Sequence, residues 1–549
     1  KMLEEEIPTV MSLMFLMIFL SIFFVLRSLA AVFSTFGVIL LTIGATFGSV
    51  GLLGNVLNQM VITYPVLIIT LALADCVHLF AIYFQERNKG ETSKESMIKS
   101  LELNLQPLFL TTVTTCIGFL SFNALDVEPL RDLGNGISLG VLFAFIYTIF
   151  FIAPLISFLD VKIPTSTQQQ VNLSRKLAIF SLSSGKTFLW TIPLICFLLI
   201  LLIPLNKLEM NPTQMYSEKY TSFGPDVLWL DKKLGASFPI SFKATSDNGS
   251  VSNPRFLEGL DNFSIWLEEQ KEVTHVTSLA RTMKSLNKSM HGDDLKMKVI
   301  PEDQELSSQY LFFYEMSLPL GLDLNTSISQ DRGSTRIAAT LREMTSKEYL
   351  IFDEKVAEYL RENNLESIIS KPAGFRVIFV YLMEAIVNSL LVGVTIGLAL
   401  IITVIGFFFR SASFGFLSSF PNILPIVSAF GIWAIIDGQI DFMVAVGMGS
   451  TLGIIVDFTV HLLSKYDLAR QELKKSPEDA VLFAFEAVGF ALIAMTIILA
   501  LGFSVLHLVS FLPMHNFAQF SILAFVFALI IDFFLFPNLL VRFDKRKFD

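Results

Sequence analysis

The sequence predicts a polytopic α-helical membrane protein with a parallel internal repeat of its helices and an α+β domain outside the membrane. The 549 residues are 53% hydrophobic and only 16% charged, with a mean hydropathy of +0.63. A soluble globule could not bury so much apolar surface. About eleven apolar segments are long enough to cross a bilayer. The apolar segments before one long polar stretch share residues with those after it at a nearly constant separation in the sequence.

Charge and motif content exclude several function classes. The net charge of −9 argues against a nucleic-acid-binding protein, which should be basic. Cys76, Cys116 and Cys196 all lie in apolar runs, with no C-x-x-C spacing for a metal. The sequence contains no Walker A loop, G-x-S-x-G or H-E-x-x-H motif, so an ATP-driven pump or a hydrolase has no support. We therefore expect neither an enzyme nor a protein with a bound cofactor.

The apolar segments group as five, then one, then five. Residues 1–160 hold the first five, 161–186 form a linker, 187–205 hold the single segment, 206–383 form the polar domain, and 384–549 hold the last five and a short tail. The predicted spans are 9–26, 31–54, 61–83, 108–125, 135–159, 187–205, 384–409, 413–436, 441–463, 485–508 and 516–540.

Loop charges predict the orientation. Basic residues gather in loops 84–107, 160–186 and 464–484 and in the tail, whereas the short loops of the other face hold only Arg131. Since basic loops stay in the cytoplasm, the linker and tail are predicted to be cytoplasmic and 206–383 exoplasmic. The same rule places the N-terminus outside, although it carries no signal sequence. A further helix and a twin of the 206–383 domain are therefore expected before residue 1.

An offset that lengthens by only one residue along the chain aligns the two groups of five. It superimposes Arg27-Ser28 on Arg410-Ser411 and Val77-His78-Leu79 on Val460-His461-Leu462. The two groups share one orientation, which makes this a parallel repeat about an axis along the membrane normal.

The exoplasmic domain alternates strands and helices. Strands are predicted at Phe238–Thr245, Val273–Ser278, Arg336–Arg342 and Ser367–Lys371, with helices opening at Asn253-Pro254 and covering Ser346–Glu362. Two βαβ units in one domain favour a ferredoxin-like α+β fold.

Four ionisable residues inside predicted spans are the leading site candidates. Asp75 and His78 lie at i and i+3, and Asp457 and His461 at i and i+4, so each pair shares a helix face. A carboxyl group buried at lipid depth and a neighbouring imidazole can exchange a proton near neutral pH, as ion-coupled transport requires. The alternative is a neutral, hydrogen-bonded pair that only locks two helices together.

Three threonines are supporting candidates, and the two carboxyl groups are not equivalent. The hydroxyls of Thr111, Thr112 and Thr496 could bond the carboxylates or line a wet path, or could bond back to their own helices. The offset of the repeat aligns Asp457 with Ala74, so Asp75 differs by about 100° around its helix. Asp532, near the cytoplasmic end of the last span, is a weaker candidate, and its side chain is expected to snorkel to the membrane surface or to be solvated.

Two local motifs resemble those of the RND superfamily. Ala74-Asp75-Cys76-Val77-His78-Leu79 is similar to the A-D-x-V-H-L form of bacterial hydrophobe/amphiphile exporters. Gly453-Ile454-Ile455-Val456-Asp457 fits the G-x-x-x-D pattern of the MMPL-type branch, which is related to sterol-sensing-domain, Patched and Niemann–Pick proteins. Leu71 and Phe458 depart from the pattern, which has Gly and Tyr there.

The resemblance implies a function that the composition cannot. It implies a proton-driven exporter of lipids or other amphiphiles in the bacterial inner membrane, with 206–383 as a periplasmic porter domain and the family's first helix and first porter domain absent. The proton-motive force would supply the energy, through Asp75, His78, Asp457 and His461. The substrate, the oligomeric state and any periplasmic partner stay open.

Two other functions are considered. One is a non-transporting sterol- or lipid-sensing membrane protein, which would not need two titratable pairs inside the membrane. The other is a SecDF-like protein-export accessory, which also uses proton flux.

Overall fold

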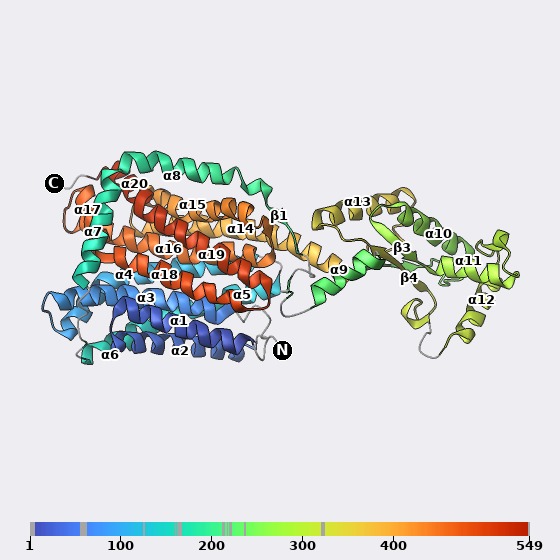
Figure 1. The fold of residues 1–549 in the computed structure, drawn as a ribbon, viewed down its shortest axis with the longest axis horizontal. Helices are drawn as coiled ribbons and strands as arrows, with labels where there is room; N and C mark the ends of the chain where they lie inside the picture. Colours follow the sequence, from blue (N-terminus) through green and yellow to red (C-terminus); the bar gives the residue numbers. More distant parts are fainter. Residues whose placement is uncertain are drawn as a thin grey trace. The chain divides into compact units, whose positions relative to one another are not determined.

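The computed structural model describes residues 6–54, 63–124, 127–159, 161, 167–210, 215–216, 218, 222–234, 238–319 and 324–546. The chain divides into two compact units, Lys1–Lys207 with Ala385–Asp549, and Leu208–Glu384. The first is a bundle of helices, and the second combines helices with a small sheet (Figure 1). The whole of 55–60, the loop predicted between the second and third spans, and residues 162–166 of the predicted linker lie outside the described residues.

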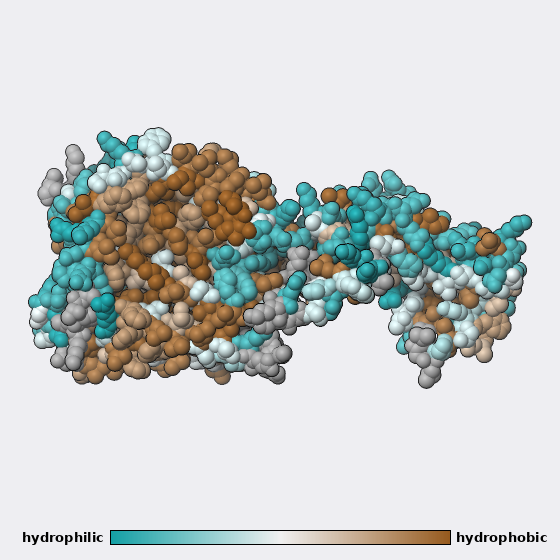
Figure 2. Space-filling model, in the orientation of Figure 1, coloured by the Kyte–Doolittle hydropathy of each residue, from teal (hydrophilic) through white to brown (hydrophobic). Residues whose placement is uncertain are grey.

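The structure confirms a multi-pass helical membrane protein. Among the described residues, eleven helical segments are long and apolar enough to cross a bilayer. Hydrophobic side chains cover much of the visible face of the helical unit (Figure 2). The spans are α1 (Ile7–Leu26), α2 (Leu29–Leu52), α3 (Tyr64–Asn88), α4 (Ser93–Leu120), α5 (Glu128–Tyr147) with α6 (Ala153–Phe158), α8 (Gly185–Ile200), α14 (Phe375–Phe408), α15 (Ala412–Ile436), α16 (Phe442–Gln471), α17 (Pro477–Ala484) with α18 (Phe490–Ser504), and α19 (Leu512–Ile530) with α20 (Phe536–Phe543).

Several helices extend beyond their predicted apolar spans. The segment predicted at 384–409 begins at Phe375, and the one predicted at 108–125 begins at Ser93. A capping box at Thr92, with Glu95 three residues later, satisfies the backbone at the polar start of α4. The linker 161–186 contains the helix α7 (Thr167–Ser183). Hydropathy finds the apolar part of a helix, whereas caps decide where the helix begins.

The same helix end recurs in both groups of helices, at the offset of the repeat. Arg27 and Arg410 both adopt a left-handed backbone conformation, with φ of 47° and 49°. The next residues, Ser28 and Ser411, are both extended and both accept a backbone N–H bond that caps the following helix. Identical geometry at equivalent positions indicates that the two helix pairs turn in the same way.

Irregular turns recur at the same offset. A π turn at η4 (Thr148–Ile152) interrupts the fifth span, and η11 (Ile531–Leu535) is a π turn at the equivalent place in the last span. The 3₁₀ turns η3 (Ser121–Ala124) and η10 (Val505–Leu508) also correspond, with their offset longer by one position. A third π turn, η9 (Phe485–Gly489), joins α17 to α18.

Helices α3 and α16 form the interior of the bundle. The most apolar windows of these two helices are 94% and 100% buried, and α4 packs against both. The approach of α4 to α16 is close, because a Cβ atom on Gly118 would lie 3.3 Å from Gly453 Cα. The Thr115 hydroxyl also donates to Gly453 O at 2.9 Å. These contacts fix α16 beside the first helix group.

The second unit is built around a three-stranded antiparallel sheet. Its order is β2 (Phe238–Thr245), β4 (Ser334–Leu341), β3 (Val273–Thr277), with β4 antiparallel to both neighbours. The side chains of β2 alternate between buried and exposed, which is the pattern of a half-buried strand. Helices of this unit are α9 (Phe223–Leu234), α10 (Pro254–Glu269), α11 (Leu279–Met290), α12 (Gln304–Ser317) and α13 (Ser346–Glu362).

The predicted strand at Ser367–Lys371 is wrong as a regular strand. This segment forms only isolated bridges with β2, Ala244 to Ile369 and Ser241 to Ala373. The two bridges differ by one position in register, so the pairing between them is irregular and no continuous strand forms. The segment still lies antiparallel along the outer edge of β2.

Ion pairs hold the C-terminal tail against α16. The Asp544 carboxylate accepts bonds of 2.9 Å from Arg470 Nε and Arg546 Nε, and Arg546 Nη1 lies 2.6 Å from Asp467 Oδ1. Burial alone would raise the pKa of Asp544, but hydrogen bonds from Arg546 and Arg470 outweigh it and lower that pKa to about 2. Arg470 therefore lies in a buried helix end, not in the predicted loop 464–484.

This arrangement predicts a pH-dependent contribution to stability. Because the folded-state pKa of Asp544 lies below that of an unfolded carboxyl group, its charge stabilises the fold above about pH 4 and loses this effect as the pH falls toward 2. We expect Asp544→Asn to lower stability by about 1 to 2 kcal/mol at pH 7, after allowance for screening by water. Thermal unfolding in detergent should show that the stability difference between the wild type and Asp544→Asn becomes smaller as the pH is lowered. Glu478→Gln, at an exposed site, is the control.

Candidate functional site

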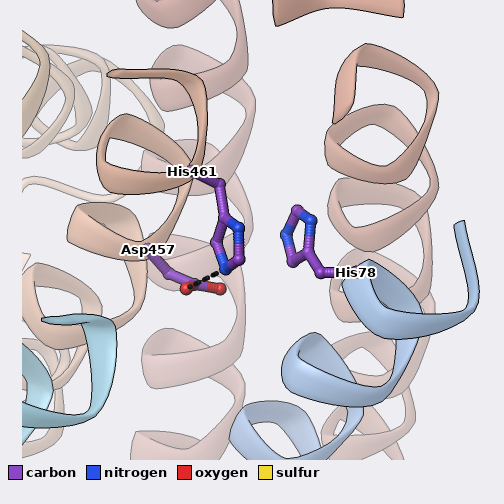
Figure 3. Close-up of side chains that lie close together, drawn as sticks. All are labelled: His78, Asp457 and His461. Carbon is purple, nitrogen blue, oxygen red and sulfur yellow. Dashed lines mark ion pairs between the residues drawn. The ribbon is translucent and has the colours of Figure 1, made fainter. Parts of the chain in front are cut away.

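Three of the four predicted site residues meet between α3 and α16. His78 comes from α3, and Asp457 and His461 come from successive turns of α16 (Figure 3). His461 Nε2 lies 3.3 Å from Asp457 Oδ1. The His78 and His461 rings are stacked, with centroids 3.5 Å apart and planes within 7° of parallel. Both histidines are fully buried, and Asp457 is 3% exposed.

The fourth residue, Asp75, lies within electrostatic range of this cluster. It is 6% exposed and interacts with the charge of Asp457. The i, i+3 spacing on α3 and the i, i+4 spacing on α16 direct these side chains toward the same region. The two helices, far apart in sequence, therefore contribute one joint site.

The cluster is short of hydrogen-bond partners. Apart from the 3.3 Å contact between His461 Nε2 and Asp457 Oδ1 and the nearby Thr111 hydroxyl, the ring nitrogens of His78 and His461 and the carboxylate oxygens of Asp457 have no hydrogen-bond partner among the described residues. Buried polar atoms are nearly always bonded, because each unbonded one costs about 1–3 kcal/mol. The cluster therefore makes few of the protein hydrogen bonds by which a purely structural pair would lock two helices together.

The stacked rings limit how much positive charge the cluster can hold. Two imidazolium groups about 4 Å apart repel each other by roughly 4 kcal/mol at an effective dielectric constant of 20. The His78 and His461 rings are this close, so only one of them can be charged at a time. The Asp457 carboxylate beside His461 would stabilise that single charge. The cluster is therefore suited to binding one proton.

The same three residues were considered as metal ligands. One ligand atom from each lies within 4.8 Å of the other two. A metal bound to imidazole lies near the plane of the ring, however, and two parallel planes 3.5 Å apart do not meet. In the described arrangement the two rings cannot share a metal ion, so the geometry favours proton binding.

Lys465, which the sequence analysis placed in the loop 464–484, also belongs to the site. It lies one turn beyond His461 on α16 and is only 1% exposed. Its ammonium group donates to Leu103 O and to Asn104 Oδ1, and Asn104 Nδ2 donates to His78 O at 3.2 Å. Positions 457, 461 and 465 repeat every four residues, and this series was the signal that could have found it.

A cavity adjoins this end of the site. Its volume is about 230 Å³, and its lining includes Lys465, Leu103, Gln85 and Glu86. The positive charge of Lys465 acts on both histidines and opposes a further positive charge there. Lys465 is thus a residue of the cavity lining that influences proton binding by the His78–His461 pair.

The supporting threonines bond to their own helices. Thr111 and Thr112 both donate to Leu108 O, at 2.9 and 2.7 Å, and Thr496 donates to Leu492 O at 3.0 Å. Thr111 also lies near the Asp457 carboxyl group. Thr112 and Thr496 therefore fit the interpretation of bonding within their own helices, whereas Thr111 fits both interpretations, because its hydroxyl also interacts with the Asp457 carboxyl group as a hydrogen-bond donor.

Comparison with known proteins gives the family. The family model described as MMPL family matches residues 2–179 and 254–547. The chain belongs to the MMPL family. It is a multi-pass membrane protein, and the family is consistent with a membrane transporter of the RND type.

The similarity to one relative supports the assignment as a membrane protein and nothing more specific. The chain is 29% identical over 154 residues to a Methanocaldococcus jannaschii protein, MJ1562, whose name proposes a membrane protein. The match covers 28% of this chain and 39% of that protein. This relative is similar to only part of the MMPL chain, and its name identifies neither a substrate nor a driving force.

Proposed function

We propose that this MMPL protein is a proton-coupled secondary transporter that exports lipids or other hydrophobic, amphiphilic molecules. The observation that carries the proposal is the buried His78–Asp457–His461 cluster, with Asp75 in electrostatic contact. Intramembrane ionisable groups are costly and usually serve transport or proton relay. Transport, without chemical conversion or a bound cofactor, would use the proton-motive force as its energy source.

The position of the cluster fits energy coupling. A proton that crosses the membrane releases about 2.3 kcal/mol per 100 mV. A transporter can use this energy only if a buried group gains and loses charge as access alternates between the two sides. The cluster can bind one proton, and the cavity at Lys465 offers a route to it from one end of α16.

Features of the fold support the transporter reading. Cap geometry and π turns that recur at equivalent positions support a parallel repeat of two helix groups. In the second unit, the bridged segment beside β2 extends the strand order to that of a ferredoxin-like domain, fourth, first, third, second. This order supports a porter domain in Leu208–Glu384.

The proposal is tested by driving transport with a proton gradient. Purified protein in proteoliposomes should move a fluorescent lipid analogue faster when a proton gradient is imposed, and a protonophore should remove the increase. Movement that ignores the gradient would contradict proton coupling. Proton flux without movement of the analogue would favour the protein-export accessory, and neither activity would favour the lipid sensor.

We further propose a bacterial inner-membrane location with Leu208–Glu384 on the periplasmic side, as the basic loops indicate. Cysteines introduced at Lys94 and Glu472 should resist an impermeant thiol reagent added to intact cells, whereas one at Met290 should react. All three positions are exposed. The parent protein, whose Cys76 and Cys196 are buried, gives the background. Labelling at 94 or 472 before lysis would reverse the orientation.

A further inference from the structure

A second buried carboxyl group lies in the other half of the helical unit. Asp532 was expected to be solvated, but its side chain is 0% exposed. It lies in the π turn η11, and π turns are frequent at functional sites. The equivalent position of η4 in the first helix group is Ile149. The turn itself therefore does not require an acid.

Asp532 ends a chain of polar groups that crosses three helical segments. Asn422 of α15 donates through Nδ2 to Ser418 O at 2.7 Å, which turns its Oδ1 toward α16. Thr459 Oγ1 of α16 lies 3.4 Å from that Oδ1 and 3.2 Å from Asp532 Oδ1. Thr459 is two residues from both Asp457 and His461, on the opposite face of α16.

The number of hydrogen bonds that Asp532, Thr459 and Asn422 can make depends on whether Asp532 is protonated. A hydroxyl carries one hydrogen, so Thr459 cannot donate to Asn422 Oδ1 and to Asp532 Oδ1 together. If Asp532 is a carboxylic acid, it donates to Thr459, Thr459 donates to Asn422, and every bond is made. If it is a carboxylate, one of these bonds is lost, and a buried charge is left with little support.

In the part of the chain that the structure describes, no cationic side chain forms an ion pair with Asp532. Asp532 Oδ2 has no hydrogen-bond partner among the described residues, and the neighbouring Ile531 and Leu535 pack in an apolar cluster with Ile192 and Cys196. The elements that pack against η11 are α7, α8, α15, α16, α19 and α20, and η9 through the contact of Phe485 with Phe533. Among the described residues, Thr459 is the side chain that acts on Asp532. The ionisable groups on the packed elements are Arg175, Lys176, Lys186, Cys196, Asp457, His461, Lys465, Tyr466, Asp467, Arg470, Glu486, His515 and Arg542.

We propose that Asp532 is a second proton-binding site, at which the carboxylic acid keeps its proton while Asp457 exchanges one. The resident proton completes the bonds that tie α16 to α15 and to η11. Asp532 is thus a positioning residue for α16, and Asp457 belongs to the coupling site. The contrast with Asp457 rests on the proposed transport function, whereas the protonation of Asp532 does not.

Infrared spectroscopy of the full chain in lipid at pH 7 tests the protonation directly. The wild type should show C=O stretching bands of buried carboxylic acids, and Asp532→Asn should remove one component that Asp75→Asn and Asp457→Asn both leave in place. Thr459→Val should shift this component without removing it, because the acid loses its acceptor. If Asp532→Asn does not fold, the band shift in Thr459→Val still tests whether Asp532 is protonated.

The alternatives give different spectra and different transport. Loss of carboxylate bands alone in Asp532→Asn would overturn the proposal, and a response of those bands to added Na⁺ would indicate a cation site instead. In proteoliposomes, Asp532→Asn should still couple transport to the proton gradient, since its amide can donate to Thr459. Loss of coupling as complete as in Asp457→Asn would overturn the assignment of a resident proton. Absence of transport in the wild type would refute the proposed function but leave the infrared result intact.

Discussion

Asp457→Asn is expected to abolish proton-driven efflux while the protein still inserts and folds. Asparagine keeps the shape of the side chain and can bond, but it cannot release or bind a proton at neutral pH. It also removes the negative charge that lies 3.3 Å from His461 and would stabilise a proton there. Since groups that transfer protons typically contribute factors of 100 or more, we expect a loss on the order of 100-fold or greater.

The measurement compares initial rates of gradient-driven movement of a fluorescent lipid analogue in proteoliposomes. Asp437→Asn is the matched control, because it makes the same chemical change at an exposed position next to α15. Equal amounts of folded protein should be verified by gel filtration and thermal unfolding. Transport by Asp457→Asn at the wild-type rate would show that the acid is structural, and the lipid-sensor reading would then be preferred.

The sequence predicted the parts of this site that follow from helical periodicity. Asp457 and His461 had to share one face of a helix, and composition placed that helix in the membrane. The stack of His78 on His461 could not be predicted, because it depends on how α3 and α16 pack together with α4. Lys465 was not predicted as a site residue, because a basic residue at the end of an apolar run usually belongs to a solvated cytoplasmic loop.

Local chemistry explains the remaining differences in the fold. The repeat was visible in the sequence because Arg27-Ser28 and Arg410-Ser411 specify the same left-handed turn and the same cap. The π turns were not visible, since no residue type specifies them. The edge segment at Ser367–Lys371 had the composition of a strand, but a one-residue shift in its register against β2 limits it to isolated bridges.

The remaining large effect is expected at Asp75. Its carboxyl group is buried on α3 and interacts with the charge of Asp457. The two groups cannot both be ionised without repulsion, so the charge on one affects proton binding by the other. Asp75→Asn removes this influence and leaves the His461–Asp457 contact in place.

We therefore expect Asp75→Asn to reduce efflux roughly ten-fold, less than Asp457→Asn, and to change its dependence on pH. The smaller effect follows from position: Asp457 contacts His461 directly, whereas Asp75 has no ion pair among the described residues. Rates should be measured from pH 5.5 to about 8, a range in which interacting acids and imidazoles titrate. Asp75→Glu, which restores the carboxyl group, should recover part of the activity and the original pH profile. A wild-type rate and profile for Asp75→Asn would assign Asp75 a purely structural role. A loss as complete as that of Asp457→Asn, reversed by Glu, would mean that both acids carry the transported proton, in spite of their different positions around the two helices.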